Sequence, residues 1–307
     1  MDRATIDVEA ASAYVRGRRT LEGGYCFYRT PSWGVEEPNA PDTLAALGSL
    51  RLLEVAPAQP HQTADWLLSL QAPGGGYATL TIGWASLRAL ALLGRGPERS
   101  PDSWLSAWSE QLLEERPTRQ PRPWLLELLR LAELFELRGV TPDRARLTRL
   151  LERSVAAHGG WPRDAAELET TGVVSELIRR ARLEPVAARS TVAFLQACED
   201  PALGLRTTPD AAATTVGALW GGVTVARNRL QALRHPEAIA ASIALLQRRD
   251  GGFGERHRAL TTLRDTWLAL RAWSTLAELQ APGSAAEKAG GGGSAEASRG
   301  QPGPDRR

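Results

Sequence analysis

The apolar positions of this chain form short helical segments, and one arrangement of segments recurs along the sequence. A first apolar helix ends near a glutamine, a turn with two glycines and an aromatic residue follows, and a second apolar helix comes next. In the clearest copy these parts are residues 243–247, 250–254 and 264–270, and the turn reads Asp-Gly-Gly-Phe-Gly. A phrase of this length that recurs at similar intervals indicates an architecture built from repeats.

Weaker copies of the phrase divide most of the chain into helix pairs. Turns of the same kind occur around Gly24, Gly76, Gly160 and, in a looser form, Gly204. The interval between Gly76 and Gly160 is long enough for two units, and helices near 102–116 and 122–138 fill it. The sequence therefore predicts an all-α fold of six consecutive helix pairs.

Each part of the phrase has a physical role. Paired glycines allow positive φ angles and close backbone approach, which a compact turn between antiparallel helices needs. Asp42, Asp210 and Asp265 stand at or near the predicted starts of second helices, where a carboxylate can accept hydrogen bonds from free amide groups. We therefore interpret these aspartates as helix caps before any catalytic role.

The second helix of each pair is expected to lie on the inside of the assembly. Segments 80–94, 122–138, 209–221 and 262–280 are richer in Ala, Leu and Trp than the first helices, which carry more Arg and Glu. Pairs that cannot bury both apolar faces alone must stack on their neighbours, as an open solenoid or a closed ring. Composition separates these two arrangements poorly.

The segment from Gln247 to Leu270 resembles the repeat shared by protein prenyltransferase β subunits, squalene–hopene cyclases and related triterpene cyclases. It contains Gln-x-x-Asp-Gly-Gly-Phe-Gly and, after a short loop, Asp-Thr-Trp-x-Ala-Leu. With its weaker copies the resemblance covers about residues 6–280 and implies a closed α/α toroid domain at 1–280. In that family the ring encloses an aromatic-lined cavity that holds an isoprenoid chain.

The resemblance also implies two catalytic signatures that can be sought here. Class II terpene cyclases protonate their substrate with an Asp-x-Asp-Asp motif, and this sequence contains none. Zinc-dependent prenyltransferases place a Cys two residues after one inner-helix Asp and a His three residues after another. The residues at those positions here are Leu44, Ala212, Trp267, Ala45, Ala213 and Leu268. We therefore expect no zinc site of that kind and no cofactor.

Substrate-binding candidates follow from the same resemblance. In the prenyltransferases an Arg three residues after the aromatic residue of the turn helps to bind the isoprenoid diphosphate, and Arg256 stands there. The planar fork of arginine suits phosphate oxygens, so nearby Arg258 and Arg264 are candidates too. Aromatic faces suit a polyisoprene wall or a carbocation, which adds Trp84, Trp124, Trp220, Trp267 and Trp273. A solvated turn and core packing remain the alternative interpretations of these two sets.

Composition and charge narrow the classes of partner. The formal net charge is +2 and the basic residues are scattered, so we expect no nucleic-acid partner. No stretch approaches about eighteen apolar residues without a charge, so we expect no membrane span and a cytoplasmic location. Residues 281–307 are rich in Gly, Ser, Ala and Pro and lack an apolar face, which predicts a disordered tail.

These observations favour a prenyltransferase- or terpene-cyclase-like protein that binds an isoprenoid, its diphosphate or another apolar small molecule inside the ring. Because neither catalytic signature is present, the sequence leaves open whether the protein is an enzyme. It also leaves open a partner protein subunit. The alternative is a non-catalytic toroid that binds an apolar ligand or serves as an interaction scaffold, which a narrow or plugged ring would favour.

Overall fold

Twelve α-helices in six consecutive pairs make up most of the regular structure in residues 5–30, 35–114 and 121–281, which the computed structural model describes. The first helices of the pairs are α1 (Val8–Arg16), α3 (Pro60–Ser69), α5 (Asp102–Glu114), α7 (Arg144–Ser154), α9 (Ala188–Cys198) and α11 (Pro236–Leu246). The second helices are α2 (Ala40–Leu52), α4 (Leu80–Leu92), α6 (Pro121–Arg138), α8 (Leu168–Arg180), α10 (Val216–Arg229) and α12 (Leu263–Gln280).

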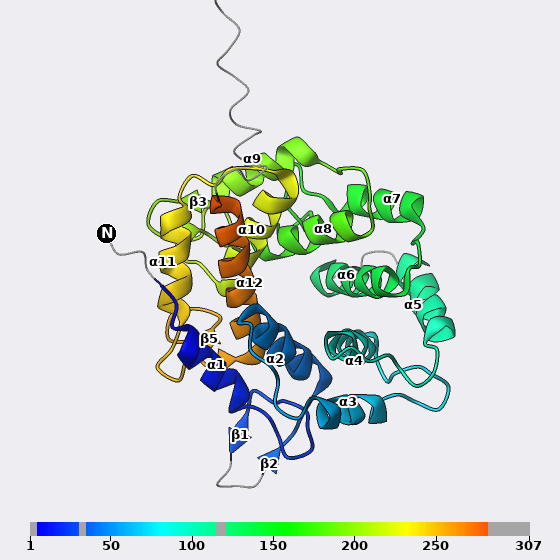
Figure 1. Cartoon of the computed structure of the whole chain (residues 1–307). Coiled ribbons are helices and arrows are strands. Elements are labelled where there is room, and N and C mark those ends of the chain that lie inside the picture. The colour runs from blue at the N-terminus through cyan, green and yellow to red at the C-terminus, as the bar shows by residue number, and fades with distance from the viewer. Residues whose placement is uncertain (1–4, 31–34, 115–120, 282–307) are drawn as a thin grey trace, which may run out of the picture.

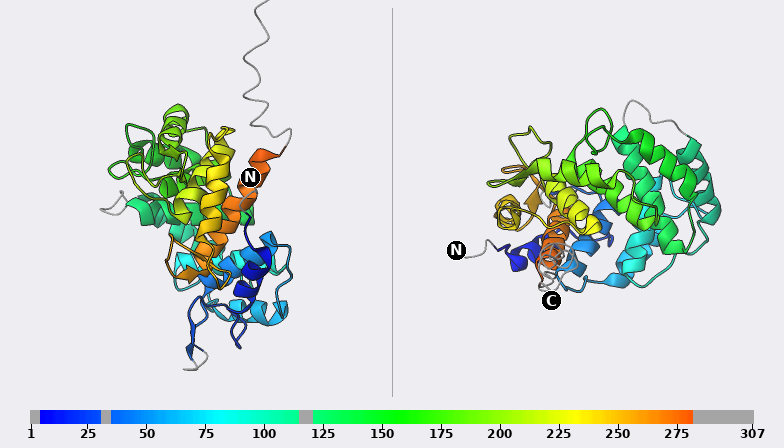
Figure 2. Two further views of the ribbon diagram at one scale, coloured as in Figure 1. Left: turned by 90° about the vertical axis from the view of Figure 1, so that its left-hand side faces the viewer. Right: turned by 90° about the horizontal axis from the view of Figure 1, so that it is seen from above.

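The six second helices form a closed inner ring. Each packs against the next in chain order, and α12 packs against α2, which completes the circle. The first helices lie at the periphery (Figure 1). In both views of Figure 2 the first pair, in blue, lies beside the last helix, in orange. The predicted all-α toroid of six helix hairpins, with the second helix of each pair inside, is therefore confirmed.

Short antiparallel ribbons accompany three of the turns that join an outer helix to its inner partner. They are β1 (Arg29–Thr30) with β2 (Val35–Glu36), β3 (Glu199–Asp200) with β4 (Gly204–Leu205), and β5 (Phe253–Gly254) with β6 (Thr261–Thr262). In the last ribbon Phe253 pairs with Thr262, directly before the first residue of α12. The ribbons therefore lie at the end of the ring where the inner helices begin.

The glycine turns allow each helix pair to pack closely against the next one. Gly251 has a φ of +88°, and a Cβ at this position would lie 2.0 Å from the carbonyl oxygen of Ala10 in α1. Gly75 has a φ of +83°, and its Cβ would lie 2.3 Å from the carbonyl oxygen of Ser100, just before α5. Both the backbone conformation and the available space therefore require glycine.

A second recurring contact joins each turn to its own inner helix. In three units the amide of the aromatic residue in the turn donates a hydrogen bond to a threonine hydroxyl in the first turn of that helix: Tyr25 to Thr43, Trp161 to Thr171, and Phe253 to Thr266. The aromatic side chains are then fully buried under the ring. The repeated phrase in the sequence is thus a repeated set of contacts.

The aspartates interpreted as caps have other positions. The caps of α2 and α12 are Asn39 and Thr262, whose side chains accept from the amides of Asp42 and Asp265. Both aspartates are third residues of their helices, so the interpretation as caps is wrong. Their acidic side chains still lie in the first turn, where the helix dipole favours negative charge.

The fifth inner helix begins later than its sequence suggests. The expected range was 209–221, but α10 begins at Val216 and is capped by Thr215, which leaves Asp210 in the preceding loop. The amide of Val216 donates to the carbonyl oxygen of Glu255 in the turn of the sixth unit. The chain therefore reaches the neighbouring turn before the helix can begin, and this tertiary contact is not visible in the local sequence.

Two further expectations concern the C-terminal tail and membrane spans. Of the predicted tail 281–307, only Ala281 falls among the described residues, so the expectation of disorder lies outside them. Among the helices of the described ranges, none combines the length and the apolar character that a membrane crossing requires.

Candidate functional site

A cavity of about 260 Å³ lies at the centre of the ring, and all six inner helices contribute to its lining. Most of the lining residues belong to the first three turns of these helices. Arg264 in the first turn of α12 and Arg271 both line the cavity, and the helix rises about 10 Å between them. We call this cavity the well, with its mouth where the inner helices begin and its floor near the middle of the ring.

The wall of the well is mainly apolar. Three tryptophans line it from α4, α10 and α12: Trp84, Trp220 and Trp267. The remaining apolar lining is made by Pro41, Ala45, Leu126, Leu129, Val173 and Leu268. The indole N–H of Trp84 donates to Oε2 of Glu133 over 2.6 Å, which fixes the orientation of this ring. An apolar wall with a few placed polar groups is typical of a small-molecule site.

The mouth of the well carries arginines that are already paired with acids. Glu169 on α8 contacts Arg122 on α6 at 2.7 Å and Arg264 on α12 at 2.5 Å. Arg264 also pairs with Asp265 at 3.0 Å. Asp42 is a further acid at the mouth, and burial raises its pKa. The mouth therefore offers little uncompensated positive charge.

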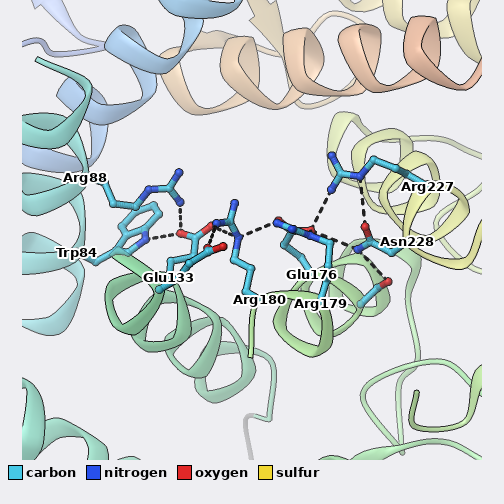
Figure 3. Close-up of polar contacts among 10 residues, drawn as sticks. Trp84, Arg88, Glu133, Glu176, Arg179, Arg180, Arg227 and Asn228 are labelled. Atoms are coloured by element: carbon cyan, nitrogen blue, oxygen red, sulfur yellow. Dashed lines mark hydrogen bonds and ion pairs between the residues drawn. The ribbon is translucent and has the colours of Figure 1, made fainter. Parts of the chain in front are cut away.

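Below the floor, ion pairs with buried carboxylates join inner helices to one another in their later turns (Figure 3). Glu133 of α6 pairs with Arg88 of α4 and, at 3.2 Å, with Arg180 of α8. Glu176 of α8 pairs with Arg180 at 2.8 Å and with Arg227 of α10 at 3.0 Å. We call these five residues the plug. Arg180 lies between the two carboxylates and links them.

Both carboxylates of the plug stay ionised although they are buried. Glu133 is 5% exposed and Glu176 is 1% exposed. Burial by itself raises the pKa of each, but the arginines around them outweigh it and hold both pKa values below the usual range. Pairing of this quality is what makes charge tolerable in the middle of a helical ring.

The guanidinium groups of two arginines at the floor of the well pack on tryptophan rings. The Cζ atom of Arg271 lies 4.8 Å from the ring centre of Trp220 and 5.1 Å from that of Trp267. The Cζ atom of Arg130 lies 5.2 Å from the ring centre of Trp84. Burial lowers the pKa of both guanidinium groups, that of Arg271 to about 10, so both remain charged at neutral pH.

The structure brings together four of the eight substrate-binding candidates from the sequence. Arg264, Trp84, Trp220 and Trp267 line the well. The other four are not among its lining residues. Arg256 and Arg258 are exposed in the loop between β5 and β6. Trp124 is buried and donates from its indole N–H to the carbonyl oxygen of Leu112 in α5, while Trp273 packs on the main core.

Sequence reasoning missed the charged residues that line the well more deeply. Arg130, Glu133 and Arg271 each interrupt an apolar run of an inner helix, and this interruption is the signal that could have identified them. Arg271 follows Trp267 by four residues, which places the two on one helix face. Glu169 was missed because only the ring brings it near Arg122 and Arg264.

The residues of the well do not fit the zinc ion of the protein prenyltransferases. The lining contains no Cys and no His, and neither residue type stands two or three positions after Asp42 in α2 or Asp265 in α12. Across the described ranges, no group of three or more His, Cys, Asp or Glu side chains is arranged to hold a metal ion.

Comparison with known sequences and structures gives one matching domain family and several similar folds. The sequence model of the prenyltransferase alpha-alpha toroid domain matches residues 1–108 and 172–289. The fold is similar to protein geranylgeranyltransferase-I of Candida albicans in complex with GGPP, with 12% identity, a TM-score of 0.62 and coverage of 88% of this chain and 91% of that one.

A second similar fold is that of the type II terpene cyclase MstE from Scytonema in complex with geranylgeranyl dihydroxybenzoate. The identity is 14%, the TM-score is 0.59, and the match covers 89% of this chain and 97% of that one. At these identities the structural likeness shows the shared fold. No curated protein matches this chain by sequence.

Proposed function

Since the chain belongs to the prenyltransferase alpha-alpha toroid domain family, we propose that it binds an isoprenoid or a similar elongated apolar small molecule in the well. The observation that carries the proposal is the well itself, which is open at one end of the ring and walled by Trp84, Trp220 and Trp267. The similar folds named above were solved with a prenyl diphosphate and with a geranylgeranyl-bearing substrate.

The energetics of such binding come mainly from the wall. Each CH₂ group moved from water to an apolar surface contributes roughly 0.8 kcal/mol. A chain of about ten carbons therefore gains several kcal/mol before the cost of losing its translational and conformational freedom. Affinity should rise with chain length until the chain reaches the charged floor at Glu133 and Arg271. Additional carbons should add little affinity, because they would remain at the mouth and outside the apolar wall.

The proposal is limited to binding and assigns no reaction. The sequence has no Asp-x-Asp-Asp acid, and the lining offers no zinc ligands of the prenyltransferase kind. The scaffold alternative keeps one supporting observation, because the ion pairs of the plug join inner helices across the ring below the well. The well, with its aromatic wall, is the reason for preferring the ligand-binding function.

Native mass spectrometry can test the proposal directly. The protein would be incubated with geranyl, farnesyl and geranylgeranyl diphosphates and with the matching alcohols. The test variant is Val173→Trp, which fills the well from α8, and the control is Val8→Trp on α1, where the side chain is 48% exposed. We expect one ligand per chain for the parent and the control, and loss of binding in Val173→Trp. Binding that survives the filled well, or no binding to the parent, would favour the scaffold.

A further inference from the structure

Arg271 stands at the floor of the well with its hydrogen-bond donors unused. It lies on α12 and contacts the rings of Trp220 and Trp267 through its flat guanidinium group. Within the described part of the chain, no carboxylate comes within ion-pair distance of Arg271, and no acceptor forms a hydrogen bond with it. A guanidinium group carries five N–H donors in a planar fork, so this residue can still receive two oxygens of one acid group.

Arg130 offers further donors to the same cavity from α6. Its Nη1 donates to Oγ1 of Thr81 over 2.6 Å, and its Cζ lies over the ring of Trp84. Its buried Nε has no hydrogen-bond partner. The guanidinium group of Arg130 also lines the well, and the one hydrogen bond to Thr81 leaves other N–H groups of its Nη atoms as donors for a ligand.

The charges around the floor do not balance. Glu133 is the only carboxylate among the residues that line this part of the well. It already forms ion pairs with Arg88 and Arg180 and accepts a hydrogen bond from the indole N–H of Trp84. Among the described residues, neither Arg130 nor Arg271 therefore has a carboxylate within ion-pair distance, and the nearest acids act on them only from further away. Burial lowers the pKa of Arg271 to about 10, although Glu133 and Glu176 favour its charged form from a longer distance.

The arginines at the mouth, in contrast, are already paired with carboxylates. Arg122 and Arg264 are held by Glu169, and Arg264 is also held by Asp265. An anion that bound there would have to compete with these carboxylates.

The tryptophan faces at the floor are already in contact with guanidinium groups, so they are poorly placed to stabilise a second cation such as a carbocation.

We propose that the floor of the well, with Arg271 as the main contact and Arg130 as the second, binds the carboxylate or phosphate oxygens of a ligand whose apolar part lies against the tryptophan wall. This inference rests on the proposed function and specifies its ligand: an apolar molecule with an anionic end, which enters with that end first. It reverses the orientation expected from the sequence, in which Arg256, Arg258 and Arg264 hold the head group at the mouth.

Three ligands with one chain and different ends provide the test: geraniol, geranic acid and geranyl monophosphate. Their affinities for the parent protein would be measured by isothermal titration calorimetry. Charge-assisted hydrogen bonds to a guanidinium group should make at least one of the two anions bind about tenfold more tightly than the alcohol. The tighter of the two anions tells whether the site prefers a carboxylate or a phosphate.

Variants locate the anionic end. Arg271→Met should abolish the preference for the anion and leave the affinity for geraniol nearly unchanged. Arg256→Met, in an exposed loop outside the well, is the control and should keep the preference. Arg264→Met tests the opposite orientation, and loss of the preference in this variant alone would overturn the inference. If Arg271→Met fails to fold, Arg130→Met replaces it, and a preference that stays within about threefold of the parent contradicts the proposal.

The outcomes separate the two proposals. Equal affinities for the alcohol and both anions would overturn the anion site while the apolar well stands. If none of the three ligands binds to the parent protein, and the longer chains also fail, the proposed function fails together with this inference.

Discussion

The amide of Asp7 donates to Oε1 of Gln247 over 2.7 Å, and Nε2 of Gln247 donates back to the carbonyl oxygen of Asp7 over 2.7 Å. These residues are 240 positions apart, so the pair of hydrogen bonds joins the last unit to the first and helps to close the ring. Gln71 makes the same reciprocal contact with the backbone of Arg99, one unit further along the chain. The glutamine of the repeated phrase thus joins two neighbouring units through a pair of hydrogen bonds to the backbone, and we call this pair the latch.

Removing the closing latch should loosen the junction between the first and last units. Gln247→Ala loses three hydrogen bonds between its side chain and the backbone, two to Asp7 and one to Gly251, so we expect the free energy of unfolding to fall by about 1–3 kcal/mol. Urea unfolding followed by circular dichroism measures this change. Gln231→Ala is the control, because its side chain bonds only to the adjacent carbonyl of Ala232. Equal losses in the two variants would contradict the latch.

Gly48 of α2 keeps space for the indole of Trp267 of α12. A Cβ at Gly48 would lie 2.5 Å from Nε1 of Trp267, closer than real contacts allow. Gly48→Ala should push this ring toward the well, lower ligand affinity and reduce stability by about 1–3 kcal/mol. The control is Gly74→Ala, where nothing lies within 4 Å. Calorimetric binding and thermal unfolding would be compared, and unchanged affinity in Gly48→Ala would show that the ring of Trp267 does not contact the ligand.

Glu176 is the more deeply buried of the two carboxylates in the plug. Glu176→Gln leaves Arg180 and Arg227 without this partner, and breaking a buried ion pair costs about 3–5 kcal/mol. Glu136→Gln, whose side chain is 42% exposed and pairs with Arg180 at the surface, should cost less than about 1 kcal/mol. Denaturant unfolding at neutral pH checks both values, and similar losses in the two variants would count against the plug.

The same residue predicts a pH dependence with a definite sign. The pKa of Glu176 is lower in the folded protein than the value near 4.3 of an exposed glutamate, because the surrounding arginines outweigh burial. Its contribution to stability is therefore fully present above about pH 5 and is lost as pH falls toward the folded pKa. The stability difference between the parent and Glu176→Gln should shrink between about pH 5 and pH 2. A constant difference over this range would mean that the carboxylate charge is not the stabilising feature.

Two tryptophans of inner helices should behave differently. Trp267→Leu should weaken ligand binding about tenfold or more and also lower stability, because Trp267 both lines the well and packs between α2 and α12. Trp124→Leu should lower stability by up to about 3 kcal/mol without changing affinity, since Trp124 is buried outside the well. Measured affinities and unfolding temperatures of the two variants provide the comparison. Reduced affinity in both would indicate general loosening of the ring.

The sequence predicted the fold well because each unit repeats the same local contacts. Glycines and an aromatic residue at the turns, and a glutamine at the end of an outer helix, are visible without coordinates. The start of α10 was missed, because the bond from Val216 to Glu255 joins two different units. Helix boundaries set by such contacts cannot be read from a local pattern.

The site was predicted only in part, and for a physical reason. The tryptophans of the wall stand out because the residue is rare and large, so Trp84, Trp220 and Trp267 were found. In a chain with many arginines, by contrast, nothing local distinguishes Arg271 at the floor from Arg256 in an exposed loop. Their difference lies in which acids surround them, and this is decided only when the inner helices meet.

The most direct test of the whole account is a crystal structure of the protein grown with geranyl monophosphate and, in parallel, with geraniol. The account predicts that the carbon chain of both ligands lies in the well against Trp84, Trp220 and Trp267. Density for the chain on the outer helices, or at the surface with the well empty, would contradict it.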